Sequence, residues 1–193
     1  MTQAPLWDIF CKVVDNHGDI GVCWRLARQL AAEQPVRVRL WIDDLQALKT
    51  LWPAAELKDR QSLAGVDVCL WSAEFDADVR VADVVIEAFA CHLPSTYIKS
   101  MAIKRDQGPA PQWFNLEYLS AESWVEGCHG LFSPHPLTGL KKAFFFPGFS
   151  FKTGGLIREK ALLETRDAFL QDPATADQWL AQQGVHRQSG SLT

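Results

Sequence analysis

Two carboxylates lie four residues apart near the N-terminus, at Asp15 and Asp19, separated by Asn16, His17 and Gly18. A pair of carboxylates can take up a proton, hold a cation or orient a substrate through charge-assisted hydrogen bonds. The start of a helix adds free N–H groups and the positive end of a dipole, which suit an anionic or electron-rich ligand. The pair therefore marks a candidate site for acid–base or ligand-binding chemistry.

The flanking residues predict a strand before this pair and a helix after it. Residues 6–14 are apolar and rich in β-branched and aromatic side chains, which is typical of a buried strand. Over residues 20–33, apolar side chains recur at spacings of three and four, with Arg25 and Arg28 on the opposite face. A strand-to-helix turn is the usual place for chemistry in a parallel α/β domain.

The same run also fits a turn with a purely structural role. Asp15 can start the turn by accepting backbone hydrogen bonds, Gly18 can supply a positive φ, and Asp19 can cap the helix. The run lacks the third glycine of the dinucleotide fingerprint and the lysine of a P-loop, so a nicotinamide or ATP site is disfavoured. Both interpretations stay open on these residues alone.

The composition is that of a soluble globular protein. The chain has 193 residues, a net charge of -4 and no basic stripe, so no nucleic-acid partner is expected. We expect no secretory leader and no membrane span, because no apolar stretch is long enough. Five cysteines without a C-x-x-C pair indicate reduced, mostly buried thiols and a cytoplasmic location. Most of the eight tryptophans and eleven phenylalanines are expected in the core, with a few left to line a groove.

Strand and helix patterns alternate along the chain. Further strands are predicted at residues 36–42, 66–71, 84–89, 113–118 and 142–146. Further helices are predicted at residues 44–51, 95–104, 153–171 and 173–184, with a short one beginning at 120–124. This order predicts an α/β, Rossmann-like parallel sheet with helices on both faces.

Other polar groups give weaker signals. The residues Thr153 to Gly155 fit either a capped helix with small residues for close packing or a ligand loop. Asn115 to Glu122 places polar groups at the end of a predicted strand, where α/β sites form. The pairs Cys91–His92 and Cys128–His129 lack the spacing of a metal site, and no G-x-S-x-G elbow is present.

Three segments together resemble the EarP family of bacterial protein-arginine rhamnosyltransferases, which modify elongation factor P. The matching segments are residues 15–30, residues 115–122, and residues 146–149 with 153–156, and the resemblance extends from about Trp7 to Gly184. It implies a GT-B architecture, in which two Rossmann-like domains face each other across a cleft. Residues 1–184 are then expected to form the N-terminal, acceptor-side domain, and residues 185–193 to begin an interdomain linker. Under this resemblance, the donor-binding domain is expected to have no counterpart in this sequence.

The resemblance also implies an activity: inverting transfer of L-rhamnose from dTDP-β-L-rhamnose to an arginine of elongation factor P, which activates this translation factor. No metal or other cofactor is expected. Asp19 is then the general base, Asp15 positions the guanidinium, and Asn16, His17, Gly18 and Asp19 bind the donor. The family has an aromatic residue at the position of His17. Alternatives are a module that binds elongation factor P without catalysis and a glycosyltransferase with another acceptor; alone, this half is expected to be inactive.

Overall fold

The structure is a computed structural model that describes residues 3–15 and 17–185. Its strands are β1 (Leu6–Cys11), β2 (Arg37–Ile42), β3 (Arg60–Leu63), β4 (Val66–Leu70), β5 (Val84–Ala88), β6 (Gln112–Leu116), β7 (Phe132–Pro134) and β8 (Lys141–Phe145). Its helices are α1 (Gly18–Glu33), α2 (Leu45–Leu51), α3 (Ser95–Gln107), α4 (Val125–Cys128), α5 (Leu162–Gln171) and α6 (Pro173–Gln182).

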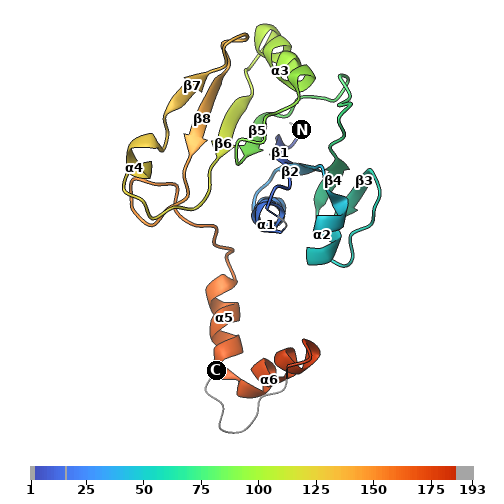
Figure 1. The fold of residues 1–193 in the computed structure, drawn as a ribbon, viewed down its shortest axis with the longest axis vertical. Helices are drawn as coiled ribbons and strands as arrows, with labels where there is room; N and C mark the ends of the chain where they lie inside the picture. The colour runs from blue at the N-terminus through green and yellow to red at the C-terminus, as the bar shows by residue number, and fades with distance from the viewer. Residues whose placement is uncertain (1–2, 16, 186–193) are drawn as a thin grey trace. The chain divides into compact units, whose positions relative to one another are not determined.

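The strands form one sheet in the order β3-β4-β2-β1-β5-β6-β8-β7 (Figure 1). Every neighbouring pair from β4 to β8 is parallel, and the two outermost pairs, β3 with β4 and β7 with β8, are antiparallel. Helices α1 and α3 form the crossovers that join two of the parallel pairs, β1 with β2 and β5 with β6. The predicted Rossmann-like, mostly parallel sheet is confirmed.

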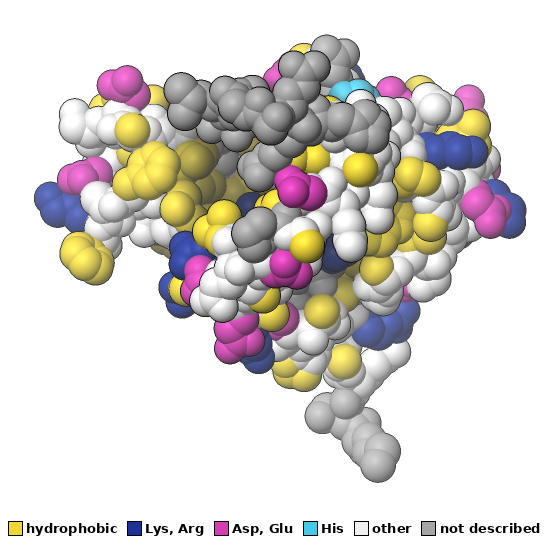
Figure 2. Space-filling view, turned by 90° about the horizontal axis from the view of Figure 1, so that it is seen from below, with side chains coloured by type: hydrophobic (Ala, Val, Ile, Leu, Met, Phe, Trp, Pro, Cys, Tyr) yellow, Lys and Arg dark blue, Asp and Glu magenta, His cyan; other side chains and the backbone are white. Residues whose placement is uncertain are grey.

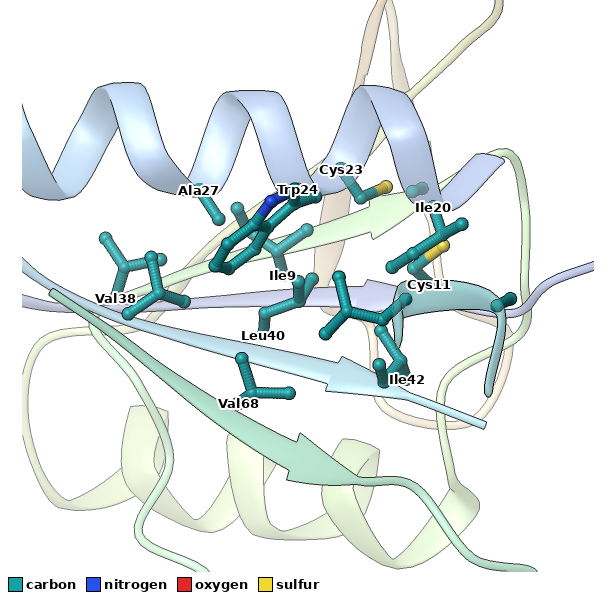
Figure 3. Close-up of a cluster of buried hydrophobic side chains, with 14 of the residues drawn as sticks. Ile9, Cys11, Ile20, Cys23, Trp24, Ala27, Val38, Leu40, Ile42 and Val68 are labelled. Carbon is teal, nitrogen blue, oxygen red and sulfur yellow. The ribbon is translucent and has the colours of Figure 1, made fainter. Parts of the chain in front are cut away.

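Helices cover both faces of the sheet, as predicted. Successive residues of a strand point to opposite faces, so in β1 Ile9 and Phe10 enter two different cores. Ile9 packs under α1 with Ile20 and Trp24, as Figure 3 shows. Phe10 lies on the other face with Tyr97 of α3, at 4.9 Å between ring centroids.

A buried ion pair joins β1 to β2 and α3. Asp8 is fully buried and accepts hydrogen bonds from Nε and Nη2 of Arg39, each at 2.6 Å. The Tyr97 hydroxyl donates to Asp8 Oδ2 at 2.5 Å and accepts from the N–H of Ala82 at 3.1 Å. Burial, followed by the charge of Asp8, raises the pKa of Tyr97 well above its usual value. Asp8 therefore has a donor on each oxygen, which a buried carboxylate requires.

The two antiparallel edge strands, β3 and β7, were not predicted. Both are short, and β3 is joined to β4 by a two-residue turn in which Ala64 and Gly65 have φ of 48° and 79°. Positive φ at both central residues is the geometry of a tight hairpin turn. An alanine in place of the usual Asn or Gly hides this turn in the sequence.

The helix predicted from Thr153 is also shorter than expected, because α5 begins only at Leu162. Gly154 packs against Phe145, and a β-carbon at Gly154 would lie 2.3 Å from that ring. Gly155 has a φ of 74°, which a helix cannot continue through. The glycines thus serve a close backbone approach, as the packing alternative expected, and the prediction that a helix begins at Thr153 is wrong.

The chain divides into two compact units, Met1–Leu156 and Ile157–Thr193. The first contains the sheet; the second contains α5 and α6, which contact each other through Phe169 and Trp179 at 6.3 Å between rings. The predicted domain boundary at residue 184 stays a prediction. Of the predicted linker 185–193, residues 186–193 lie outside the described residues.

The aromatic side chains divide between core and surface, and fewer of them are buried than predicted. Phe10, Trp41 and Trp113 are buried, whereas Phe149 and Phe151 of the same unit are exposed. Figure 2 shows hydrophobic side chains gathered in patches between charged ones on the face that it presents.

All five cysteines are free, and three of them are buried. No helix among the described residues is long and apolar enough to cross a membrane.

Candidate active site

The candidate site lies where the strand order changes direction. From β1 the chain runs to β2 and β4 on one side, then returns to β5 on the other side of β1. The carboxyl ends of β1, β5 and β6 therefore lie next to one another at one edge of the sheet. Ligands of open parallel α/β sheets bind in the crevice at such a switch point. The turn after β1, which carries the two aspartates, occupies this position.

Asp19 is almost completely buried, with 1% of its surface exposed. Its Oδ2 accepts hydrogen bonds from the backbone N–H groups of Val14 and Asp15, both at 3.0 Å. Its Oδ1 accepts from the Tyr118 hydroxyl at 2.9 Å. The side chain therefore folds back onto the turn before the helix, and three donors fix the orientation of the carboxylate.

The turn differs in two respects from the purely structural role considered for it, in which Gly18 supplies a positive φ and Asp19 caps the helix. The helix begins at Gly18, and His17 is the cap residue, without a side-chain capping bond. Asp19 lies in the first helical turn and is not the N-cap. Gly18 does not have a positive φ. Asp15 does start the turn, because its carbonyl oxygen accepts from the N–H of Gly18 at 2.8 Å.

Asp15 and Asp19 differ in exposure although both belong to one short turn. Asp15 is exposed, and a β-carbon on Gly18 would lie 3.1 Å from its Oδ2. The absence of a side chain at Gly18 thus leaves room for this carboxylate. The site pairs a fixed, buried carboxylate with one that faces solvent, which suits a division between proton transfer and substrate orientation.

His17 is exposed and lines a pocket of about 250 Å³ beside the turn. The other lining residues are Val13, Val14, Asp44, Gln46, Ala47 and Thr50. Asn16 lies outside the described residues. The donor-binding roles of Asn16, His17 and Gly18 stay predictions.

Two residues join the site that the sequence analysis did not single out, Tyr118 and Phe89. Tyr118 follows β6 and is 54% exposed, and its ring stacks on Phe89, which follows β5, at 4.2 Å and 15°. Desolvation, followed by the hydrogen bond to Asp19, raises the pKa of Tyr118 to about 12. Tyr118 lies within the polar run after β6, and its place beside Asp19 follows from the common edge of parallel strands.

Other polar side chains on β5, β6 and β8 and just after β6 pair with one another. Asn115 Nδ2 donates to Glu117 Oε1 at 2.5 Å, and Glu87 accepts from Trp113 and from Lys142, both at 3.1 Å. Burial raises the pKa of Glu117. These bonds form a separate polar cluster, and none of them reaches Asp19.

Two thiols lie under the turn, and both are buried. Cys11 ends β1 and Cys23 lies in α1, as Figure 3 shows. A hydrogen bond with the Cys11 thiol, followed by burial, raises the pKa of Cys23 well above its usual value. A protonated, buried thiol is a poor nucleophile, so Cys23 serves packing.

Fold and site together define a Rossmann-like domain with a carboxylate site at its switch point. The family model described as elongation factor P (EF-P) rhamnosyltransferase EarP matches residues 7–193. The chain therefore belongs to the EarP family.

Curated relatives of the chain are named protein-arginine rhamnosyltransferases. One from Pseudomonas putida is 55% identical over 187 residues, which are 96% of this chain and 48% of the relative. One from Pseudomonas aeruginosa is 51% identical over 95% of this chain and 48% of the relative. One from Neisseria meningitidis is 43% identical over 89% of this chain and 46% of the relative. The chain thus spans about half the length of these relatives.

Proposed function

We propose that this chain is the acceptor-side half of an inverting GT-B enzyme that transfers L-rhamnose from dTDP-β-L-rhamnose to an arginine of elongation factor P. The observation that carries the proposal is the pair of unlike carboxylates at the switch point, in a chain that matches the family over residues 7–193. The names of the relatives support an arginine acceptor and a rhamnosyl donor.

The chemistry explains why carboxylates are needed. A guanidinium has a pKa above about 12, so its nitrogen is a poor nucleophile while it is protonated. In the proposed step, a guanidinium nitrogen forms a bond to the anomeric carbon of rhamnose while the bond from that carbon to the diphosphate oxygen breaks. Asp19 takes the proton that the nitrogen loses, and the leaving dTDP keeps the electron pair of the broken bond. Asp15 orients the guanidinium through charge-assisted hydrogen bonds.

The experiment uses a chimaera in which this chain replaces the matching segment of the Pseudomonas putida relative. With dTDP-β-L-rhamnose, the chimaera should add one deoxyhexose to elongation factor P, as read by intact mass. An elongation factor P whose acceptor arginine is changed to lysine is the control. If the folded chimaera binds elongation factor P and leaves it unmodified, the proposal is wrong for this chain and the binding-module alternative gains support.

Gly18→Ala should weaken catalysis without weakening the fold. Gly18 is the first residue of α1 and does not have a positive φ, so alanine fits the backbone there and the melting temperature should hold. The new methyl group would crowd Asp15 Oδ2, which lies 3.1 Å from that position, and transfer by the chimaera should fall about tenfold or more.

Gly21→Ala is the matched control for this variant. A β-carbon at Gly21 would meet only the Leu51 side chain, at an ordinary 3.7 Å. Equal transfer rates in the two variants would show that Gly18 has no special relation to Asp15. Melting temperatures from circular dichroism complete the comparison.

A further inference from the structure

We propose that Tyr118 is a positioning residue, which orients the Asp19 carboxylate toward the substrate. This inference rests on the proposed function, because it assigns Tyr118 a part in the same proton transfer. Tyr118 lies 99 positions along the chain from Asp19, and its hydroxyl donates to Asp19 Oδ1 at 2.9 Å.

The hydrogen bonds of Asp19 leave little freedom. An ionised carboxylate offers roughly four acceptor positions, two on each oxygen. The N–H groups of Val14 and Asp15 fill both positions of Oδ2, and Tyr118 fills one position of Oδ1. Among donors from the described part of the chain, none fills the second position of Oδ1, which can receive a substrate proton. The Tyr118 hydroxyl sets the direction in which that position points.

Phe89 holds the Tyr118 ring in place. The two rings stack at 4.2 Å with 15° between their planes. Phe89 has a φ of 55°, in the left-handed region that is costly for an aromatic residue, and its N–H donates to the carbonyl of Leu116 at 2.7 Å. This backbone bond ties the loop after β5 to the end of β6, two residues before Tyr118. The strained backbone thus supports the ring that orients Asp19.

The hydroxyl stays a donor over the working pH range. A tyrosine hydroxyl is protonated at neutral pH, and the pKa of Tyr118, raised from 10.0 to about 12, extends this range, so the group keeps its hydrogen bond to Asp19. Only tyrosine combines a ring that stacks on Phe89 with a hydroxyl that reaches Oδ1. Tyr118→Phe keeps the stack and removes the donor, whereas Phe89→Leu keeps the donor and removes the stack.

The contact is tested in this chain by the ionisation of its tyrosines, labelled with ¹³C at Cζ and read by NMR. The chain has only two, and a spectrum of Tyr97→Phe at neutral pH assigns the Tyr118 signal. In the unmutated chain Tyr118 should ionise near pH 12, and in Asp19→Asn it should ionise closer to the unperturbed value of 10.0. An unchanged ionisation in Asp19→Asn would overturn the proposal.

The positioning role is tested in the chimaera. Tyr118→Phe should lower kcat about tenfold to hundredfold, because it removes a hydrogen bond to the charged group that takes the proton. The KM for elongation factor P should change less than about twofold, because Tyr118 is proposed to act on Asp19 and not on the acceptor. Phe89→Leu should lower kcat by a smaller factor.

The control is Tyr97→Phe, which also removes a tyrosine–aspartate bond, at Asp8, outside the site. It should keep kcat at a temperature where the protein is folded. An unchanged kcat in Tyr118→Phe would overturn the positioning role alone, whereas no transfer by the unmutated chimaera would overturn the proposed function itself.

Discussion

Asp19→Asn in the chimaera should lower kcat by about 10²- to 10⁴-fold, the usual contribution of a general base. The amide has the size of the carboxylate and can still accept from the N–H groups of Val14 and Asp15, so the turn should keep its shape. The amide cannot take up the proton of the guanidinium, so the chemical step fails while binding persists. Steady-state kinetics with elongation factor P measure the loss.

Asp15→Asn is the comparison that separates the two carboxylates. Because Asp15 is exposed and is proposed to orient the guanidinium, its loss should raise the KM for elongation factor P more than Asp19→Asn does. Calorimetric titration with elongation factor P should give an unchanged affinity for Asp19→Asn within about twofold. Near-normal turnover in Asp19→Asn would rule out the general-base role.

Asp8→Ala should destabilise the chain by about 3–5 kcal/mol, the cost of leaving one partner of a buried ion pair without the other. Arg39 would lose two hydrogen bonds of 2.6 Å, and the Tyr97 hydroxyl would lose its acceptor. Urea unfolding followed by tryptophan fluorescence measures the change in the free energy of unfolding.

The control for this prediction is Asp67→Ala, which removes the partner of Arg37. That ion pair spans 3.7 Å, and its side chains are 50% and 47% exposed, so its loss should cost less than about 1 kcal/mol. The two variants are well matched because Arg37 and Arg39 lie on the same strand, β2. Similar losses for the two variants would show that the burial of Asp8 does not make its ion pair costly to break.

Much of the fold could be predicted from local pattern. The period of the apolar residues predicted α1 and its neighbouring strands. The helix predicted at residues 44–51 is α2, which Asp44 caps by accepting from the N–H groups of Gln46 and Ala47. The edge strands β3 and β7 were not predicted, because a strand of three or four residues has too few positions to show an alternation of apolar and polar side chains. The helix expected at Thr153 failed because the packing of Gly154 against Phe145 overrides a local helix signal.

The site could be predicted only in part. The sequence places Asp15 and Asp19 in one turn, and a parallel sheet brings that turn to its carboxyl edge. The hydrogen bond from Tyr118 and the stacking of Phe89 depend on strand order, which joins segments far apart in the chain. The inward turn of the Asp19 carboxylate is local, because its Oδ2 accepts from the N–H groups of Val14 and Asp15 in the preceding turn. The sequence pattern did not show it because an aspartate at a helix start also fits the role of N-cap.

The central claim is that the turn of Asp15 and Asp19 drives arginine rhamnosylation. Its most direct test is the fragment-ion mass spectrum of elongation factor P after incubation with dTDP-β-L-rhamnose and either the chimaera or its Asp19→Asn variant. We expect a deoxyhexose on one arginine with the chimaera and almost none in the same time with the variant. Modification at equal rates by both proteins, or on a residue other than arginine, would contradict the account.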